Sequence, residues 1–255
     1  MENIPQRETL FCDLSAFVRP LMISAVGAGG KTSTLFWLAK LFRQAGRRVL
    51  ITTTTNMFLP AEQCPVMLCR DPAQLPAAFF QQPLAACFSR WLPEAGKVRG
   101  FTPETIDALA AREDCDVILV ESDGAHGFAI KAPDEHEPCI PQTSHCVIAV
   151  TGGGMLGQSV RPDNVHRWPA FSRITGAAPE DTLDFSMLLR LVRHPQGLFK
   201  GVPPGCRRVW LLNQISQNEK FPAPLFSAAL EHGEADVVWL GAVQETPAIT
   251  RRLVR

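Results

Sequence analysis

The fold of this chain is decided by one stretch, Ser24-Ala25-Val26-Gly27-Ala28-Gly29-Gly30-Lys31-Thr32-Ser33. An apolar run at 20–23 precedes it, and a helix-forming run at 35–42 follows it. A strand, a glycine-rich loop, a Lys-Thr pair and a helix, in that order, are typical of a phosphate-binding P-loop. The stretch therefore predicts that the chain binds a nucleotide.

Each part of this stretch has a physical role in binding phosphate. Glycines let the backbone approach an anion closely, and the following helix presents unpaired N–H groups and a partial positive charge to it. We expect Lys31 to reach the terminal phosphates and the Thr32 hydroxyl to bind Mg²⁺. Ala25 occupies the position of the first glycine in the standard pattern. The predicted nucleotide-binding residues of the loop are Gly27, Ala28, Gly29, Gly30, Lys31, Thr32 and Ser33.

Composition limits the other classes of function. The chain has 255 residues, is 46% hydrophobic and carries zero net charge. Zero net charge does not favour a nucleic-acid partner, and no apolar run is long enough for a membrane helix. The first residues lack a signal-peptide pattern, so we expect a cytoplasmic protein with eight reduced cysteines. We expect the basic tail at 251–255 to be a solvated end.

The rest of the chain alternates between strand-like and helix-like segments. Strands are predicted at 48–53, 66–68, 85–88, 116–121, 146–150, 208–213 and 237–240. Helices are predicted at 102–112, 162–174, 180–192 and 225–232. This alternation favours an α/β fold, a P-loop three-layer αβα sandwich with a mostly parallel sheet. We expect one nucleotide-binding domain over 1–255, with a helical insertion at about 161–201.

A second chemical signal, Glu121-Ser122-Asp123-Gly124, ends one of the predicted buried strands. An acidic residue at the tip of a strand beside a P-loop faces the phosphates and holds Mg²⁺, because a hard cation prefers oxygen ligands. The sequence does not rank Glu121 above Asp123. Both are candidate catalytic residues and, with Thr32, candidate metal ligands.

The next segment carries further candidates. Lys131 could pair with an anionic substrate, and His136 and Glu137 could act as acids, bases or metal ligands; a polar surface loop is the alternative. Cys139 could handle sulfur or selenium, although a structural cysteine is favoured. Hydroxyls of the threonine run at 52–55 could face phosphate or Mg²⁺, but threonine is also common in strands.

The identity of the base is the weakest prediction. GTPases recognise guanine with Asn-Lys-x-Asp after a late strand, whereas this chain has Asn213-Gln214-Ile215-Ser216. We keep Asn213 as a nucleotide-binding candidate, but the missing carboxylate removes much of the discrimination for guanine. ATP and GTP both stay open. The glycine run at 152–157 spells G-x-G-x-x-G, but no helix-forming sequence follows it, so we interpret it as a loop beside the substrate.

These motifs resemble a known family. The hydrophobic strand with Glu-Ser-x-Gly is similar to the SIMIBI group of P-loop proteins. A narrower resemblance covers nearly the whole chain, and it is to the YqeC family of accessory proteins for selenium-dependent molybdenum hydroxylases. It is carried by the motifs at 27–32, 52–55, 121–124, 131–133, 136–141 and 211–213. The resemblance implies a role in maturing or supplying a selenium-containing cofactor.

Three functions are consistent with these observations. The first is a Mg²⁺-dependent purine nucleoside triphosphatase, or a phosphoryl-transfer enzyme, that assists maturation of a selenium-containing molybdenum hydroxylase. The second is an ATP-dependent kinase or ligase acting on a small anion. The third is a nucleotide-gated chaperone or adaptor with little turnover. The expected partners are a purine nucleotide and, through the resemblance, such a hydroxylase or its maturation proteins.

Overall fold

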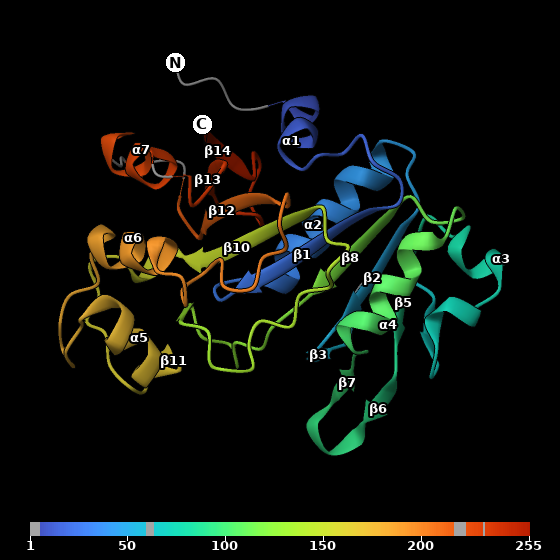
Figure 1. Cartoon of the computed structure of the whole chain (residues 1–255), viewed down its shortest axis with the longest axis horizontal. Helices are drawn as coiled ribbons and strands as arrows, with labels where there is room; N and C mark the ends of the chain where they lie inside the picture. The colour runs from blue at the N-terminus through green and yellow to red at the C-terminus, as the bar shows by residue number, and fades with distance from the viewer. Residues whose placement is uncertain (1–5, 60–63, 217–222, 232) are drawn as a thin grey trace.

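The computed structural model in Figure 1 describes residues 6–59, 64–216, 223–231 and 233–255. Its centre is a sheet with the strand order β14-β13-β12-β10-β1-β8-β2-β5-β4. Every pairing in this sheet is parallel except that of β13 with β14. The strands are β1 (Leu21–Gly27), β2 (Val49–Thr53), β4 (Val66–Leu68), β5 (Leu84–Phe88), β8 (Val117–Glu121), β10 (Cys146–Gly152), β12 (Arg207–Asn213), β13 (Val237–Gly241) and β14 (Ile249–Val254).

Helices cover both faces of this sheet. They are α1 (Arg7–Asp13), α2 (Lys31–Gln44), α3 (Ala77–Phe80), α4 (Pro103–Asp107), α5 (Trp168–Thr175), α6 (Phe185–Arg193) and α7 (Ala223–Glu231). Short 3₁₀ turns are η1 (Pro72–Gln74), η2 (Pro93–Ala95), η3 (Ala108–Ala111) and η4 (Gly153–Met155). The predicted α/β sandwich with a mostly parallel sheet is confirmed.

Alternating side chains of the sheet pack against the helices on its two faces. Ile23 of β1 packs in the same cluster as Leu38 and Phe42 of α2. Its neighbour Met22 faces the other side, in a cluster with Ile106 of α4. Because successive strand residues point to opposite faces, one strand supports both layers. This burial on both faces explains the continuous apolar runs.

The predicted helical insertion at 161–201 contains α5 and α6. Phe171 of α5 and Leu188 of α6 are fully buried in one cluster with Ala149 of β10 and Trp210 of β12. Figure 1 shows both helices beside the β10–β12 side of the sheet. The segment therefore packs directly against the central sheet.

Two small sheets and the last strand differ from the sequence analysis. One joins β3 (Asn56–Phe58), β7 (Lys97–Arg99) and β6 (Arg90–Leu92), and the other joins β9 (Ile130–Lys131) and β11 (Val165–His166). The prediction of a solvated basic tail is wrong. Residues 249–254 form the antiparallel edge strand β14, and the Nε of Arg252 donates to Asp13 Oδ2 at 2.6 Å. Among the described residues, no helix is long and apolar enough to span a membrane.

Candidate nucleotide site

The loop between β1 and α2 provides no side-chain cap for the amino end of α2. Helix α2 begins at Lys31, its N-cap Gly30 has a left-handed backbone with φ 115°, and no side chain within the described chain caps it. The first N–H groups of a helix have no partner inside the helix. They and the partial positive charge of the helix end are therefore directed at whatever lies in front of Lys31.

The preceding loop amides are already bonded to other parts of the protein. The N–H groups of Gly27, Ala28 and Gly29 donate, in that order, to Asp123 Oδ2, Val150 O and Phe128 O at 2.9, 2.9 and 3.1 Å. Three of the predicted phosphate-binding amides thus have protein acceptors in this structure. The amides that lead into α2, from Gly30 to Ser33, form the part of the loop best placed for an anion.

Gly29 is required by a close approach of two backbones. Its φ is +86°, and a Cβ built on it would lie 2.4 Å from the Gly152 nitrogen. Gly152 ends β10 and donates its own N–H to Ala129 O at 2.9 Å. The 152–157 glycine run therefore borders the candidate phosphate loop, and it contains the 3₁₀ turn η4. Its position beside a substrate stays a prediction.

Lys31 is a buried cation at the centre of the site. Its side chain is 4% exposed, and its Nζ donates to Gly27 O at 2.6 Å and lies 3.0 Å from Asp123 Oδ1. Gly27 lies at the start of the loop, and Asp123 follows the end of the neighbouring strand β8. The ammonium is therefore held beside the amino end of α2, where it can exchange these partners for phosphate oxygens.

The structure distinguishes the two acidic candidates. Thr32 Oγ1 donates to Glu121 Oε2 at 2.6 Å. Glu121 is buried, and desolvation raises the pKa of its carboxyl group. A hydroxyl and a carboxylate side by side form an oxygen donor pair that suits Mg²⁺. Asp123, in contrast, already bonds Lys31, Lys131 and the Gly27 amide. The described residues hold no group of three or more His, Cys, Asp or Glu side chains suited to a metal ion.

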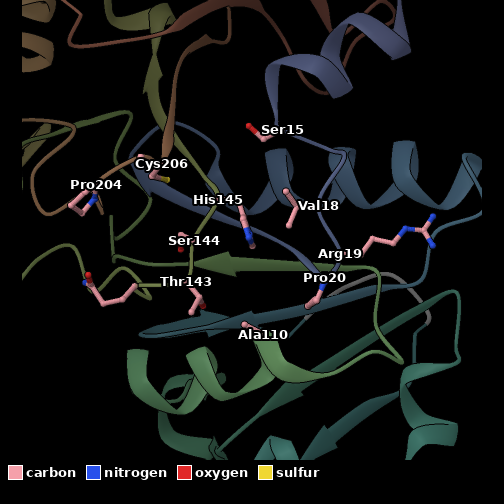
Figure 2. Close-up of a pocket in the computed structure, with 12 residues that line it drawn as sticks. Ser15, Val18, Arg19, Pro20, Ala110, Thr143, Ser144, His145, Pro204 and Cys206 are labelled. Carbon is pink, nitrogen blue, oxygen red and sulfur yellow. The ribbon is translucent and has the colours of Figure 1, made fainter.

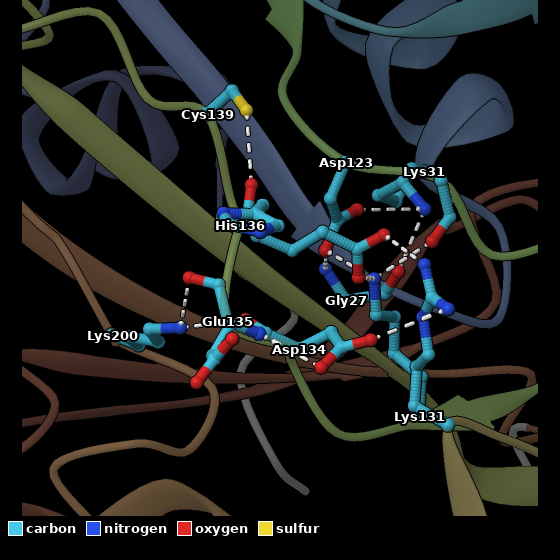
Figure 3. Close-up of polar contacts among 12 residues, drawn as sticks. Gly27, Lys31, Asp123, Lys131, Asp134, Glu135, His136, Cys139 and Lys200 are labelled. Carbon is cyan, nitrogen blue, oxygen red and sulfur yellow. Dashed lines mark hydrogen bonds and ion pairs between the residues drawn. The ribbon is translucent and has the colours of Figure 1, made fainter. Parts of the chain in front are cut away.

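Asp123 links the loop lysine to a second buried lysine (Figure 3). Lys131 Nζ is fully buried and lies 3.1 Å from Asp123 Oδ2 and 2.7 Å from Glu137 Oε2. It also donates to Gly124 O at 2.7 Å. All these partners belong to the protein, so Lys131 holds the Asp123 and Glu137 side chains together in this structure. Its pairing with an anionic substrate stays a prediction.

The linkage continues to the protein surface. Arg167, immediately before α5, pairs with Glu137 Oε1 at 3.0 Å and with Asp134 Oδ2 at 3.3 Å. Burial alone would raise the pKa of Glu137, but Lys131 and Arg167 outweigh it and lower the pKa to about 2. We name the connected side chains of Lys31, Asp123, Lys131, Glu137 and Arg167 the charge relay. It joins the loop before α2 to the 132–141 segment and to α5.

Sequence reasoning missed Arg167, and the structure records no side-chain contact that tests the role assigned to His136. Arg167 has a left-handed backbone with φ 60° and gave no motif signal. His136 is exposed, and at this position the structure records Cys139 Sγ donating to the His136 carbonyl oxygen at 3.3 Å. Cys139 is thus tied to its own loop. The catalytic role of His136 stays a prediction.

The threonine run is bonded to backbone carbonyls. Thr52, Thr53 and Thr54 donate their hydroxyls, in that order, to Cys87 O, Glu121 O and Cys139 O at 2.8, 2.7 and 2.8 Å. These bonds tie the end of β2 to its neighbours. They place the Glu121 backbone and account for the threonines without a phosphate.

Asn213 connects the loop before α2 to the β13–β14 connection. Its Nδ2 donates to Gly29 O at 2.8 Å, and its Oδ1 accepts from the Val243 N–H at 3.0 Å. Beside it lies a small cavity of about 70 Å³ lined by Gly30, Ser33, Asn213, Gln214, Ala242, Val243 and Gln244. Since both ends of the Asn213 amide are used, the exposed amides of Gln214 and Gln244 are better placed to read a base.

His166 provides a pH-dependent prediction. Desolvation, with the nearby charges of Lys131 and Arg167, lowers the pKa of His166 to about 4. In the unfolded chain His166 is protonated below about pH 6.5, whereas in the folded chain it is protonated only below about pH 4. We therefore expect the free energy of unfolding, measured by urea titration, to decrease as the pH is lowered from 6.5 to about 4. The variant His166→Gln should show a flatter pH dependence than the wild type; an unchanged slope contradicts the assignment.

Comparison with known proteins gives the relationship of the chain. A model of the YqeC protein family matches residues 23–169. The chain belongs to the YqeC family. It is 56% identical over 255 residues, covering 100% of both chains, to the protein described as "Uncharacterized protein YqeC" from Escherichia coli (strain K12). No solved structure matches. The segment matched by the YqeC model contains all five members of the charge relay.

Proposed function

We propose that this YqeC-family chain binds a Mg²⁺–purine nucleoside triphosphate at the amino end of α2. The observation that carries the proposal is the combination of an uncapped helix terminus with the buried Lys31 and the Thr32–Glu121 pair. The helix amides and Lys31 would bind the phosphates. Thr32 and Glu121 would hold Mg²⁺, which neutralises phosphate charge and favours phosphoryl transfer.

The base would lie at the protein surface next to the small cavity beside Asn213, and ATP and GTP are both candidates. Its lining offers amide groups from Gln214 and Gln244. Amides donate and accept hydrogen bonds, so these two side chains can pair with either purine. The choice of base is the first property that nucleotide titration would establish.

Nucleotide-gated docking of a partner is the second candidate function. The charge relay favours it because Lys31 shares Asp123 with Lys131, which is bonded to Glu137 of the 132–141 segment. When Lys31 moves to a phosphate, Asp123 loses one of its cations, and the bonds along the relay change. A kinase or ligase that uses Lys131 to bind a small anion is less favoured, because Lys131 is fully buried by its partners.

The proposed pathway rests on the resemblance described in the sequence analysis. We propose that the activity serves maturation of a selenium-dependent molybdenum hydroxylase, as the sequence resemblance implies. We propose a cytoplasmic location, where the eight cysteines of the chain would stay reduced.

Phosphate release from Mg²⁺–ATP and Mg²⁺–GTP tests the proposed function. The variant Thr32→Val should raise the Mg²⁺ concentration for half-maximal activity by about tenfold or more, because it removes a proposed metal ligand. Thr32→Ser keeps the hydroxyl and should behave like the wild type. Equal Mg²⁺ dependence of both variants would contradict a metal role for Thr32. If neither nucleotide turns over, the nucleotide-gated adaptor becomes the favoured form of the proposal, with binding as its readout.

A further inference from the structure

The small sheet of β3, β7 and β6 has one face that is open to solvent. Residues that pair directly across antiparallel strands point to the same face, and so do alternate residues of one strand. The register therefore places two rows of three side chains on this face. We name it the outer face, and its rows are Asn56, Arg99 and Arg90, then Phe58, Lys97 and Leu92. Figure 1 shows the β6–β7 hairpin projecting from the body of the protein.

The opposite face of this small sheet belongs to the core. Met57 and Val98 are buried there, in the same cluster as Leu35 of α2. On the outer face, in contrast, the Phe58 side chain is 64% exposed, and Arg99 is exposed as well. The small sheet is thus held in place from one side and presents an aromatic ring and charged groups on the other.

The outer face carries three cations that have no acidic partner. Arg90, Lys97 and Arg99 form no ion pair with any residue that the structure describes. The Lys97 Nζ lies 4.7 Å from the centroid of the Phe58 ring. In the sequence from 90 to 99 the single acid is Glu94, at the turn between β6 and β7. The face is therefore electropositive, and its cations are available to carboxylates from outside the chain.

The outer face adjoins the candidate nucleotide site. Gly100, directly after β7, donates its N–H to Thr55 O at 2.7 Å, and the neighbouring Thr54 N–H donates to Glu121 O at 3.0 Å. The end of β7 and the Glu121 backbone are thus tied to the same short segment. Burial raises the pKa of Glu121, and the charge of Lys97 is one of those that oppose this rise. A partner on the outer face would consequently lie next to the Thr32–Glu121 pair.

An open sheet face fits a protein partner better than a small molecule, because small-molecule sites are concave. Neither the cavity beside Asn213 nor the cavity of about 520 Å³ in Figure 2, whose lining includes His145, contains a residue of the outer face. Aromatic and arginine side chains are enriched in protein interfaces. Domains that bind nucleic acid usually have a strong positive net charge, whereas this chain has none.

We propose that the outer face docks an acidic segment of a partner protein, whose carboxylates pair with Arg90, Lys97 and Arg99 and whose apolar side chains pack against Phe58 and Leu92. An arginine can bind a carboxylate through two parallel N–H···O bonds, which favours an acidic partner. The exposed ring supplies apolar contact between the charged pairs. The face is formed by the fold itself, so docking goes beyond the proposed nucleotide binding and does not require it.

Fluorescence anisotropy of a labelled peptide in which Glu alternates with Val tests the proposal on the full chain. The matched probes are the same peptide with Gln in place of Glu and a labelled single-stranded DNA of similar length. We expect saturable binding of the Glu peptide that weakens as salt is added, and binding of the Gln peptide that is weaker by about tenfold or more. Tighter binding of the DNA than of the Glu peptide would overturn the proposal and assign the face to nucleic acid.

Charge-reversal variants locate the bound peptide. Arg99→Glu should weaken binding of the Glu peptide by about tenfold or more, because an attractive charge becomes repulsive; Arg90→Glu, on the neighbouring strand, should act in the same way. Phe58→Ala should weaken binding by about threefold or more through the lost apolar contact. Arg190→Glu makes the same charge change at an exposed position of α6 and should bind like the wild type.

These titrations contain no nucleotide, so failure of the proposed nucleotide site leaves their result intact. Three results would overturn the docking proposal: no saturable binding of the Glu peptide, equal affinity for the Gln peptide, or unchanged affinity in Arg99→Glu.

Discussion

Replacing Lys131 by methionine is expected to lower the free energy of unfolding by about 3–5 kcal/mol, because Asp123 and Glu137 each lose a charged bond inside the protein and keep only one cation, Lys31 and Arg167 respectively. Lys131 is fully buried and bonds both Asp123 and Glu137. Methionine has a similar length, so the cavity term is small. The lost charge is the main cause of the expected effect.

Urea unfolding of the purified chain measures this change. Lys40→Met, at an exposed position of α2, is the matched control and should shift stability by less than about 0.5 kcal/mol. The double variant Lys131→Met with Glu137→Gln should recover part of the loss, since the second change removes a carboxylate that has lost its buried cation and keeps only Arg167. A loss below about 1 kcal/mol in Lys131→Met would contradict the charge relay as a stabilising unit.

The variant Lys31→Ala is expected to weaken nucleotide triphosphate binding by at least about 30-fold, equal to about 2 kcal/mol, because it removes a charge-assisted bond to the phosphates. The fold should persist, since Asp123 keeps Lys131 and the Gly27 amide as partners. Fluorescence anisotropy of an N-methylanthraniloyl derivative of each purine nucleotide gives the affinities. Lys40→Ala, also on α2, is the control. Equal affinity of Lys31→Ala and the wild type would place any nucleotide elsewhere.

Hydrophobic patterning was enough to predict the central sheet. Strand β8 is buried on both faces, and its sequence Val117–Glu121 is a continuous apolar run closed by an acid. The loop before α2 was equally clear, because glycine, lysine and threonine have a fixed order there. Both signals are local, so sequence alone was sufficient for the architecture.

Elements that depend on distant partners were not predictable. Strand β14 contains Arg251 and Arg252 and has no apolar alternation, so its pairing with β13 is set by tertiary contacts. Arg252 pairs with the carboxylate of Asp13, which lies near the other end of the sequence. Strands β6 and β7 are also short and partly polar. Propensity carries little information for such segments.

The motifs predicted which residues form the candidate site, but they did not predict how these residues pair with one another. Lys31, Thr32, Glu121 and Asp123 were identified from motifs, and the structure brings them together. Their pairings were not predictable, because a sequence does not show which charged side chains form ion pairs with each other. Asp123 proved to be shared by two lysines, and the Glu137–Arg167 pair joins segments about 30 positions apart.

The central claim is that the amino end of α2 binds a Mg²⁺–purine nucleoside triphosphate. Calorimetric titration of the wild-type chain with non-hydrolysable analogues of ATP and GTP, with and without Mg²⁺, tests it most directly. We predict one saturable site for at least one analogue, with a dissociation constant on the order of micromolar and a clear dependence on Mg²⁺. The absence of saturable heat with both analogues in the presence of Mg²⁺ would contradict the account.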